Sequence, residues 1–408
     1  MIEIAVWFVS FLSLFLGIFW IRVLYAEVEE KKGPWKPKVS IIVPAYNEEM
    51  VIKETLQALQ NTGYPQDKLE IIAVNDGSTD KTKEIIEECI KEGARIKLLN
   101  REKNGGTKAA ALNMGVNNAT GEIIGCVDAD STVTFGSIDN MLTYFEDEKV
   151  AAVISAIKVD ETKNIYEKVQ RLEYIISTFS RKLMAKINTL HNTPGALSLY
   201  RAHRLREIGG FDENNLTEDL EVALHLIAKG HKIKIAPECI TFTKVPNSFR
   251  TLWNQRVRWF RGFIYNTVKY KQFLFNKKHG MVGMFQYPVN VLTIIVTITM
   301  AMLIGIELIE KIHTTSVKVG VLGVNIIRLI DIPSLKEVFL GLNIKIMFPI
   351  AITILLSLYM YNEAHKLVNE KWTNLGILVI YMTVYPIVRT LHWITAVTKE
   401  ARRSKNKW

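Results

Sequence analysis

Two apolar regions bracket a polar region in this chain of 408 residues, and this division limits what it can fold into. Residues 4–25 form an apolar run long enough to cross a bilayer, which takes about 20 residues. Further apolar runs follow the polar region, at about 286–310, 338–361 and 373–397. The pattern predicts a membrane protein with an N-terminal transmembrane helix at 1–30, a transmembrane region at 284–398 and a separately folded domain between them.

Charged residues beside the first apolar run indicate an orientation. Basic residues near the ends of spans are enriched on the cytoplasmic side. A cleaved signal peptide fits poorly, because Glu3 stands where a basic residue is usual and the basic residues come after the run. We therefore expect a multi-pass protein of the cell membrane with its middle domain in the cytoplasm. The basic residues are Lys31, Lys32, Lys36 and Lys38.

The last apolar run leaves the topology open. Three C-terminal spans would place the basic tail from Lys399 to Lys407 outside, against the usual distribution of positive charge. Arg389 and His392 lie within this run, and a charge at the bilayer centre costs about 2.5–3.5 kcal/mol on insertion scales. Either the last run does not cross the bilayer, or the stretch around 319–330 contains a further crossing. The arginine should face protein or a polar channel, or the helix lies shallower.

Charge and cysteine usage exclude other classes of protein. The formal net charge is +10, and eight basic residues with no acidic one fall between Arg250 and Lys278. Basic residues beside apolar segments favour contact with anionic lipid of the bilayer, so we expect no nucleic-acid partner. The three cysteines lie far apart and no histidine pair has metal-ligand spacing, which argues against a disulfide framework and a zinc site.

Short β-branched runs alternate with helical patterns between residues 39 and 237. Alternation of this kind predicts an α/β fold with a mainly parallel sheet covered by helices on both faces. Ligands of such sheets bind beyond the carboxyl ends of the strands. The expected strands are 39–43, 69–74, 96–99, 122–127, 150–157 and 233–236, and the expected helices include 50–60, 81–92 and 107–117.

Three loops at expected strand ends carry groups suited to a nucleotide. Asp76, in Val-Asn-Asp-Gly-Ser, can accept hydrogen bonds from ribose hydroxyls or a base N–H, although this motif alone also fits an ordinary Asx turn. Lys108 follows two glycines at a helix start, where free N–H groups bind phosphate. The loop after the first strand can hold a base and ribose, with Ala45, Tyr46, Asn47 and Glu48.

Two acidic motifs supply the chemistry of a group transfer. Asp128 and Asp130 follow an apolar strand, and Mg²⁺ or Mn²⁺ is held by one or two such carboxylates together with substrate phosphates. The metal neutralises charge that develops on a leaving diphosphate. Glu218 and Asp219 begin a helix, where one can take the proton of an attacking hydroxyl while the other orients sugar hydroxyls. A solvated turn and plain helix capping by Thr217 are the alternative interpretations.

An amphipathic helix at 248–278 carries a polar face that we expect to contact a sugar chain and its diphosphate. Gln255, Arg258 and Trp259 share this face with Gly262, at spacings i, i+3, i+4 and i+7. A merely peripheral amphipathic helix is the alternative. The opposite face is an apolar stripe that we expect to lie in lipid: Trp253, Val257, Phe260, Ile264 and Val268.

Two further features of these helices bear on the membrane. Arg256 and Arg261 flank the apolar stripe, and we expect them to reach lipid headgroups. A second amphipathic helix at 164–190 fits docking at the membrane interface and equally a helix–helix contact within the protein.

Four motifs follow one another along the chain: Val-Asn-Asp-Gly-Ser with Asp76, the Asp128/Asp130 pair, Thr217-Glu218-Asp219, and Gln-x-x-Arg-Trp with Gln255, Arg258 and Trp259. In this order they resemble those of glycosyltransferase family 2, in particular the membrane-embedded processive synthases of cellulose, chitin, hyaluronan and poly-N-acetylglucosamine. The resemblance covers about residues 38–278 and implies a GT-A catalytic domain at 38–240. It also implies a nucleotide-sugar donor (usually of uridine diphosphate), a divalent metal, and inversion at the anomeric carbon. By this resemblance Asp219 is the base, Asp76 and Asp128 contact the nucleotide, Asp130 is the metal ligand, and Gln255, Arg258 and Trp259 contact the acceptor and diphosphate.

We expect an inverting, metal-dependent hexosyltransferase that moves a sugar from a nucleotide donor to a growing glycan or a lipid-linked acceptor. Repeated addition with passage of the product through the protein's own helices is one mode of action. The few spans and the lack of a regulatory domain argue against extrusion of a long polymer by this chain alone. The alternative is a single-step transferase making a glycolipid or polyprenyl-phosphate sugar, although relatives of the latter kind generally lack the Gln-x-x-Arg-Trp motif. A nucleotide-binding transporter is a third possibility, which the Thr217-Glu218-Asp219 motif disfavours.

Overall fold

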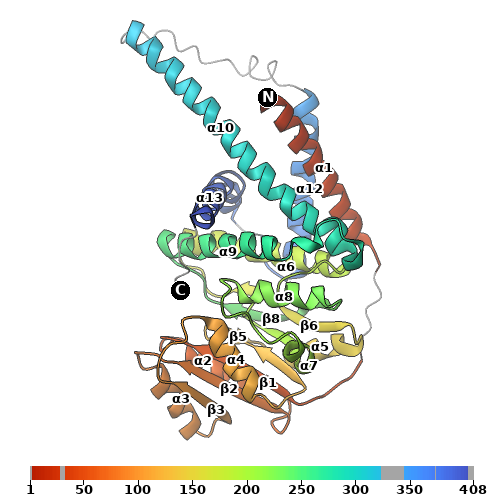
Figure 1. The fold of residues 1–408 in the computed structure, drawn as a ribbon, viewed down its shortest axis with the longest axis vertical. Helices are drawn as coiled ribbons and strands as arrows, with labels where there is room; N and C mark the ends of the chain where they lie inside the picture. The colour runs from red at the N-terminus through yellow and green to blue at the C-terminus, as the bar shows by residue number, and fades with distance from the viewer. Residues whose placement is uncertain (1, 28–32, 323–343, 373, 403–408) are drawn as a thin grey trace. The chain divides into compact units, whose positions relative to one another are not determined.

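The computed structural model describes residues 2–27, 33–322, 344–372 and 374–402, and the chain divides into two compact units (Figure 1). The helical unit consists of Met1–Tyr25 and Val289–Asn362. The sheet unit consists of Ala26–Pro288 and Glu363–Trp408, so it includes the last helix of the described chain.

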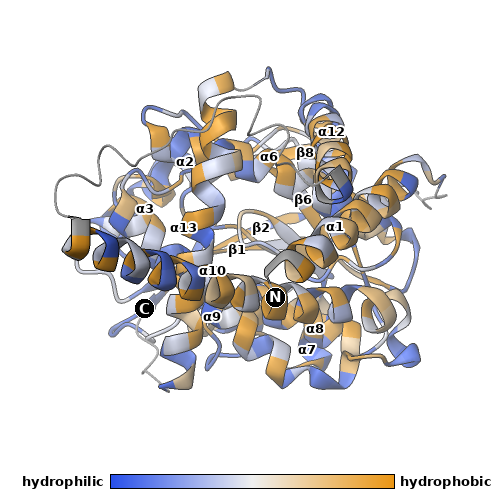
Figure 2. Cartoon of the chain, turned by 90° about the horizontal axis from the view of Figure 1, so that it is seen from above, coloured by the Kyte–Doolittle hydropathy of each residue, from blue (hydrophilic) through white to orange (hydrophobic). Residues whose placement is uncertain are grey.

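The described part of the helical unit contains three long helices. It contains α1 (Ile2–Tyr25), most of α10 (Tyr287–Leu322) and most of α12 (Ile344–Leu367). Figure 2 shows apolar residues over most of α1. By length and composition, four helices of the described chain can cross a membrane, at Ile4–Tyr25, Val282–Val321, Met347–Leu367 and Leu375–Ala401. Most of the stretch 319–330, where a further crossing was an alternative, lies outside the described residues.

The sheet unit contains an eight-stranded sheet of order β3-β2-β1-β4-β7-β6-β8-β5. Four neighbouring pairs are parallel (β1–β2, β1–β4, β2–β3, β6–β8) and three are antiparallel (β4–β7, β6–β7, β5–β8). The predicted α/β fold with a mainly parallel sheet is therefore confirmed. The strands are β1 (Val39–Ala45), β2 (Leu69–Asp76), β3 (Ile96–Arg101), β4 (Ile123–Cys126), β5 (Ser131–Val133), β6 (Val150–Val159), β7 (Ser198–Arg201) and β8 (Lys232–Thr243).

Strands β5 and β7 are absent from the sequence prediction. They have three and four residues, too short to show the alternation by which longer strands are found. Both pair antiparallel with their neighbours, which is why the sheet is mixed.

Helices cover both faces of the sheet. Adjacent residues of a strand point to opposite faces. Ile41 packs in a cluster with Leu59 of α2 (Ile52–Gln60), whereas Ile42 lies against Gly115 of α4 (Lys108–Asn118). The other helices of this unit are α3 (Thr82–Lys91), α5 (Ser137–Leu142), α6 (Ile165–Lys186), α7 (Ala202–Glu207), α8 (Glu218–Ala228), α9 (Phe249–Lys269) and α13 (Leu375–Ala401).

The strand register determines where loops emerge. Ala45 of β1 lies opposite Asn75 of β2, and Ile42 lies opposite Cys126 at the end of β4. The chain segments that leave these three parallel strands therefore begin at the same edge of the sheet. This edge carries the sequence motifs that follow β1, β2 and β4.

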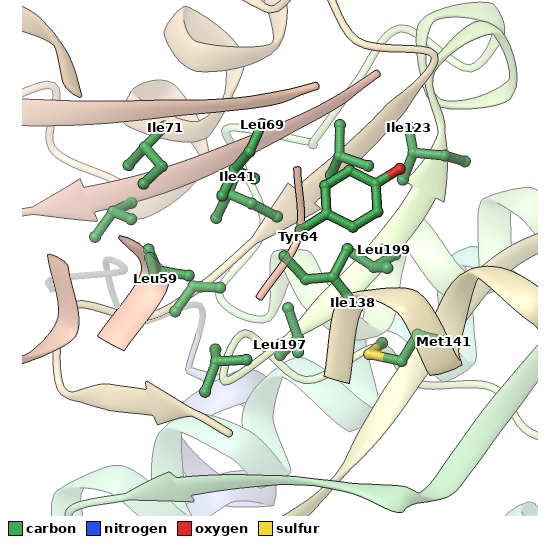
Figure 3. Packing of buried hydrophobic residues seen from close by; sticks show 14 of the residues in the cluster. Ile41, Leu59, Tyr64, Leu69, Ile71, Ile123, Ile138, Met141, Leu197 and Leu199 are labelled. Atoms are coloured by element: carbon green, nitrogen blue, oxygen red, sulfur yellow. The ribbon is translucent and has the colours of Figure 1, made fainter. Parts of the chain in front are cut away.

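We predict that Ile41→Ala lowers the free energy of unfolding by about 2–5 kcal/mol, because it leaves a cavity in a fully buried cluster (Figure 3). Ile165→Ala is the control, since its side chain is 45% exposed and such changes stay within about 0.5 kcal/mol. Denaturant unfolding of the full chain in detergent, followed by fluorescence, measures both. Equal effects of the two substitutions would contradict the packing.

Candidate active site

The loops after β1 and β2 are joined by hydrogen bonds. Asn47 has φ +57°, in the left-handed region that asparagine tolerates better than most residues. In this conformation its Oδ1 accepts from the Thr79 backbone N–H at 2.8 Å, and its own N–H donates to Ser78 Oγ at 3.1 Å. The Glu48 N–H donates to Thr82 Oγ1 at 2.7 Å. The two loops expected to hold a nucleoside thus form one surface.

Asp76 ends β2 and is buried, where it fixes a third loop. Its Oδ1 accepts from the Gly105 N–H at 3.0 Å and lies 3.2 Å from Arg101 Nε. Gly77, at φ +70°, lies so close to the backbone of Lys103 and Asn104 that a Cβ there would clash. Asp76 therefore positions the glycine loop that precedes α4 and Lys108.

Lys108 joins the two acidic motifs. Its ammonium group forms an ion pair with Asp128, and it lies 3.6 Å from Glu218 Oε1. Burial alone would lower the pKa of Lys108, but the carboxylates of Asp128 and Glu218 outweigh burial and raise it. One cation from the start of α4 thus brings together residues that are 90 positions apart, as the numbers 128 and 218 show.

A loop between α6 and β7 contacts both acidic motifs. The Asp128 N–H donates to the Gly195 carbonyl at 2.8 Å, and the Thr193 N–H donates to the Asp219 carbonyl at 3.2 Å. A Cβ on Gly195 would clash with the Asp128 carboxylate and with Lys108 Nζ. The sequence prediction gave no role to this loop, and its only signal is the Pro194-Gly195 pair, which marks a turn.

Asp130 lies among other carboxylates. Burial, and after it the Asp128 carboxylate, raises the pKa of Asp130 to about 6. Burial, followed by Asp130 and Asp128, raises the pKa of Glu48 to about 7. The loop after β1 therefore brings a third acid towards the acidic pair. Carboxylate oxygens are the hard donors that Mg²⁺ or Mn²⁺ prefers.

The protein groups alone do not complete a metal site. Within the described parts of the chain, no group of three or more His, Cys, Asp or Glu side chains is arranged to hold a metal ion. An ion at Asp130 would need further oxygens, such as those of a bound phosphate.

Glu218 and Asp219 begin α8 inside the protein. Burial raises the pKa of both carboxyl groups, although the nearby Lys108 and Arg258 oppose the rise. Thr217 forms no side-chain cap for this helix. Its hydroxyl instead accepts from Asn266 Nδ2 of α9 at 3.1 Å. Plain capping by Thr217, the alternative interpretation of this motif, is therefore not what the structure contains.

Helix α9 docks its polar face on the loop before α8. Arg258 Nη1 donates to the Leu216 carbonyl at 3.0 Å. Gly262 lies so close to Thr217 that a Cβ there would clash with the threonine side chain. Gln255 accepts from Arg256 Nη1 at 2.5 Å, and the Arg256 guanidinium lies 4.2 Å from the centre of the Trp259 ring. The structure thus places Arg258 and Gly262 of this face beside the Thr217-Glu218-Asp219 segment.

The apolar side of α9 packs on protein, which corrects the expectation that the stripe lies in lipid. Trp253 contacts the His392 ring at 4.4 Å between centroids, and Phe260 stacks on Trp393 at 4.3 Å. Both partners belong to α13, whose packing on α9 the sequence pattern cannot reveal. Val268 is 65% exposed, so only part of the stripe is covered.

The expected reach of two arginines to headgroups is also wrong. Arg256 is 1% exposed and donates to Glu173 Oε2 of α6 at 2.6 Å. Arg261 Nε donates to Glu400 Oε1 of α13 at 2.6 Å. Both side chains point inward because acidic partners on neighbouring helices compensate their charge.

Helix α6 makes contacts within the protein. It packs against β6 and β8 on one side and against α13 on another. Of the two interpretations of this amphipathic pattern, the structure shows the helix–helix contact. Its buried apolar residues are Val169, Leu172, Ile175, Phe179 and Leu183.

Known proteins are similar to this chain in sequence and in fold. Residues 40–209 match Glycosyl transferase family 2. The chain is 30% identical over 295 residues to poly-beta-1,6-N-acetyl-D-glucosamine synthase of Staphylococcus aureus (strain COL), a match that covers 65% of this chain and 69% of that protein. It is 33% identical over 273 residues to the probable glycosyltransferase YdaM of Bacillus subtilis, covering 62% of this chain and 63% of YdaM. The chain therefore spans less than two thirds of the length of YdaM.

The fold is similar to that of a solved structure along nearly the whole chain. The mannosyltransferase PcManGT from Pyrobaculum calidifontis, in complex with GDP-Man and Mn²⁺, has a TM-score of 0.65 at 19% identity, with 99% of each chain covered. At this identity the likeness shows the fold, and the expected GT-A architecture of the sheet unit is confirmed.

We predict that Arg256→Met lowers the free energy of unfolding by about 3–5 kcal/mol, because it removes the guanidinium partner of the largely enclosed Glu173 carboxylate. The double substitution Arg256→Met/Glu173→Leu should recover much of this loss. Lys83→Met is the control, since Lys83 and Glu87 form an exposed pair at 3.7 Å, worth at most about 1 kcal/mol. Thermal unfolding in detergent measures all three. A single and a double variant of equal stability would contradict the role of this pair.

Proposed function

The chain belongs to glycosyl transferase family 2, and on that premise we propose that it is an inverting, metal-dependent glycosyltransferase. It moves a sugar from a nucleotide diphosphate, uridine diphosphate in the first instance, to a growing glycan at the membrane. One observation carries this proposal: Lys108 contacts both Asp128 and Glu218, so the acidic pair suited to a metal and the acids suited to proton transfer share one site.

The donor binds at the edge where β1, β2 and β4 end. The hydrogen bonds between the Asn47 loop and the Thr79 loop give a continuous surface for the base and ribose. Ala45, Tyr46, Asn47 and Glu48 contribute from the first loop. Asp76 supports this surface, because its carboxylate accepts from the Gly105 N–H and forms an ion pair with Arg101. Asp128 and Lys108 lie next along the same edge, where the diphosphate follows the ribose.

Asp130 holds the divalent ion, Mg²⁺ or Mn²⁺. Its pKa, raised by burial and by the Asp128 carboxylate, reflects the repulsion that a bound cation relieves. When bound, the ion neutralises the charge of the leaving diphosphate. PcManGT, which has a similar fold, contains GDP-Man and Mn²⁺ in its solved structure, and this supports the use of a divalent metal.

Asp219 takes the proton from the acceptor hydroxyl, and Glu218 orients the sugar. Burial raises the pKa of the Asp219 carboxyl, which makes its carboxylate a stronger base. Lys108 and Arg258 keep the charged form accessible. Direct attack of the hydroxyl opposite the leaving group inverts the anomeric centre.

The polar face of α9 binds the acceptor end and the diphosphate. Arg258 is held against the loop of the base by the Leu216 carbonyl, and Trp259 packs against the Arg256 guanidinium. An indole held in this way presents a flat apolar surface to a sugar ring. Gln255 lies one turn earlier on the same face.

The acceptor is a glycan chain, in keeping with the polysaccharide synthases among the relatives. We propose N-acetylglucosamine as the first sugar to test. The catalytic domain faces the cytoplasm, where nucleotide sugars are made, and the helical unit crosses the bilayer.

The direct test is transfer of label from nucleotide sugars. Membranes that contain the full chain are incubated with labelled UDP-N-acetylglucosamine, UDP-glucose or GDP-mannose and Mg²⁺ or Mn²⁺. The proposal expects metal-dependent incorporation into a product of several sugars. A product with one sugar on a lipid would establish the single-step alternative, and no incorporation from any donor would refute a glycosyltransferase.

We predict that Asp219→Asn lowers kcat by about 10²–10⁴-fold, because the proton acceptor is lost while the shape of the side chain is kept. Donor binding should change little, since the donor lies at the strand ends. Initial rates and calorimetric titration with the nucleotide measure the two effects. Glu87→Gln, an acid of α3 that pairs on the surface with Lys83, is the control. Undiminished transfer by the Asp219→Asn variant would rule out this base.

We predict that Asp130→Asn raises the Mn²⁺ concentration needed for half-maximal activity by about tenfold or more, since even changes behind a metal ligand cost about 10–100-fold in affinity or activity. Titration of activity with Mn²⁺ at fixed donor measures this change. Asp139→Asn is the control, because Asp139 pairs with Lys36 at 3.2 Å, away from the strand-end loops. An unchanged metal dependence of the Asp130→Asn variant would place the ion elsewhere.

A further inference from the structure

The last helix of the described chain, α13, has the length and composition of a membrane span. We propose that α13 does not cross the bilayer but lies in its interface, along the sheet unit, with an uncharged outer face against lipid. Both ends of α13 are then on the same side of the membrane as the sheet. This proposal does not depend on the proposed activity.

Contacts at both ends hold α13 on the sheet unit. Just before the helix, Glu370 forms ion pairs with Arg171 of α6 and with Lys158 of β6, the latter at 3.6 Å. In its last turn, Glu400 accepts from Arg261 of α9 at 2.6 Å. The two ends are therefore fixed to helices and a strand of one folded domain.

The middle of α13 is held in the same way. Tyr385 donates from its hydroxyl to Glu173 of α6 at 2.8 Å. His392 and Trp393 contact Trp253 and Phe260 of α9, and Figure 1 shows α13 beside α9. A helix of 27 residues is about 40 Å long. If it crossed a hydrocarbon core of about 30 Å, one end would leave this domain.

The polar groups through which α13 contacts the sheet unit lie on one side of the helix. At 100° per residue, Tyr385, Arg389, His392 and Glu400 fall on this side. Tyr385 and His392 are buried, whereas Arg389 is exposed and its guanidinium lies 6.0 Å from the centre of the Phe260 ring. A long arginine side chain can reach polar surroundings from a helix that lies shallow, which was one of the possibilities that the sequence left open.

The opposite side of α13 is uncharged and exposed. Val384 is 51% exposed, Ile387 64% and Leu391 47%, and the residues between them on this side are threonine and isoleucine. Lipid is the occupant of this face because only a short connection joins α13 to the preceding membrane-spanning helix α12. Residues 368–374 separate α13 from the apolar α12, so the helix starts within about 25 Å of the end of that span.

Basic residues flank the outer face and match anionic headgroups. Lys371 lies before α13, and Lys399 and Arg402 lie at its end. With α13 in the interface, Lys399 and Arg402 at its end remain on the side of the sheet unit. This agrees with the enrichment of positive charge on the cytoplasmic side, which three C-terminal spans would violate.

The test compares the accessibility of single cysteines in intact cells and in permeabilised cells. Lys81→Cys marks the sheet unit, Lys371→Cys the start of α13 and Arg402→Cys its end, and all three positions are exposed. Lys318→Cys, an exposed position near the end of α10, marks the other side. The background carries serines in place of Cys89, Cys126 and Cys239, which are buried. The probe is a membrane-impermeant maleimide.

We predict that positions 81, 371 and 402 label alike, and that position 318 shows the opposite pattern. If position 402 labels like 318 and unlike 371, α13 crosses the bilayer and the proposal is refuted. A spin label at Ile387→Cys tests the occupant of the outer face. Relaxation by oxygen, which concentrates in lipid, should exceed relaxation by a water-soluble nickel chelate. Stronger relaxation by the chelate would show that this face lies in water and would refute the lipid contact.

Discussion

The ion pair of Lys108 with Asp128, extended to Glu218, is the interaction on which the site depends. Each of the three side chains comes from a different part of the sheet unit: the start of α4, the segment after β4 and the start of α8. Two acids this close repel each other, and the ammonium group between them compensates both charges. Without Lys108, repulsion between Asp128 and Glu218 would favour separation of the segment after β4 from the first turn of α8.

The packing of helix α9 between two neighbours also constrains the site. One side lies on the loop before α8, through Arg258, Gly262 and Asn266, and the other side packs on α13. Arg256 is shared between these sides, because it pairs with Glu173 of α6 and also lies over Trp259. The position of the indole therefore depends on a buried charge pair that Tyr385 of α13 completes. The helices near the membrane and the geometry of the proposed acceptor site are parts of the same packing.

Sequence patterns predicted those parts of the fold whose signal is local. Strand β1 is apolar along its length and ends in Pro44-Ala45-Tyr46-Asn47, so both the strand and the following loop can be read directly. The same holds for Asp128 and Asp130 after β4. The turn at Gly195 could not be found, because its role arises from contact with Asp128 and Lys108, which are distant in sequence. The stripe of α9 was assigned to lipid because periodicity reveals an apolar face but does not identify what covers it.

The distribution of charge at the strand ends explains why a nucleotide sugar and a metal should bind together. Besides burial, Asp130 and Asp128 raise the pKa of Glu48, and Asp128 raises the pKa of Asp130. Lys108 is already engaged by Asp128 and Glu218. A diphosphate approaching this edge alone would meet carboxylates rather than free cations. A divalent ion held by Asp130, as proposed, would reverse the local field and would give the diphosphate oxygens a partner. Donor affinity in such a site should therefore be controlled by the metal more than by any single contact to the nucleoside.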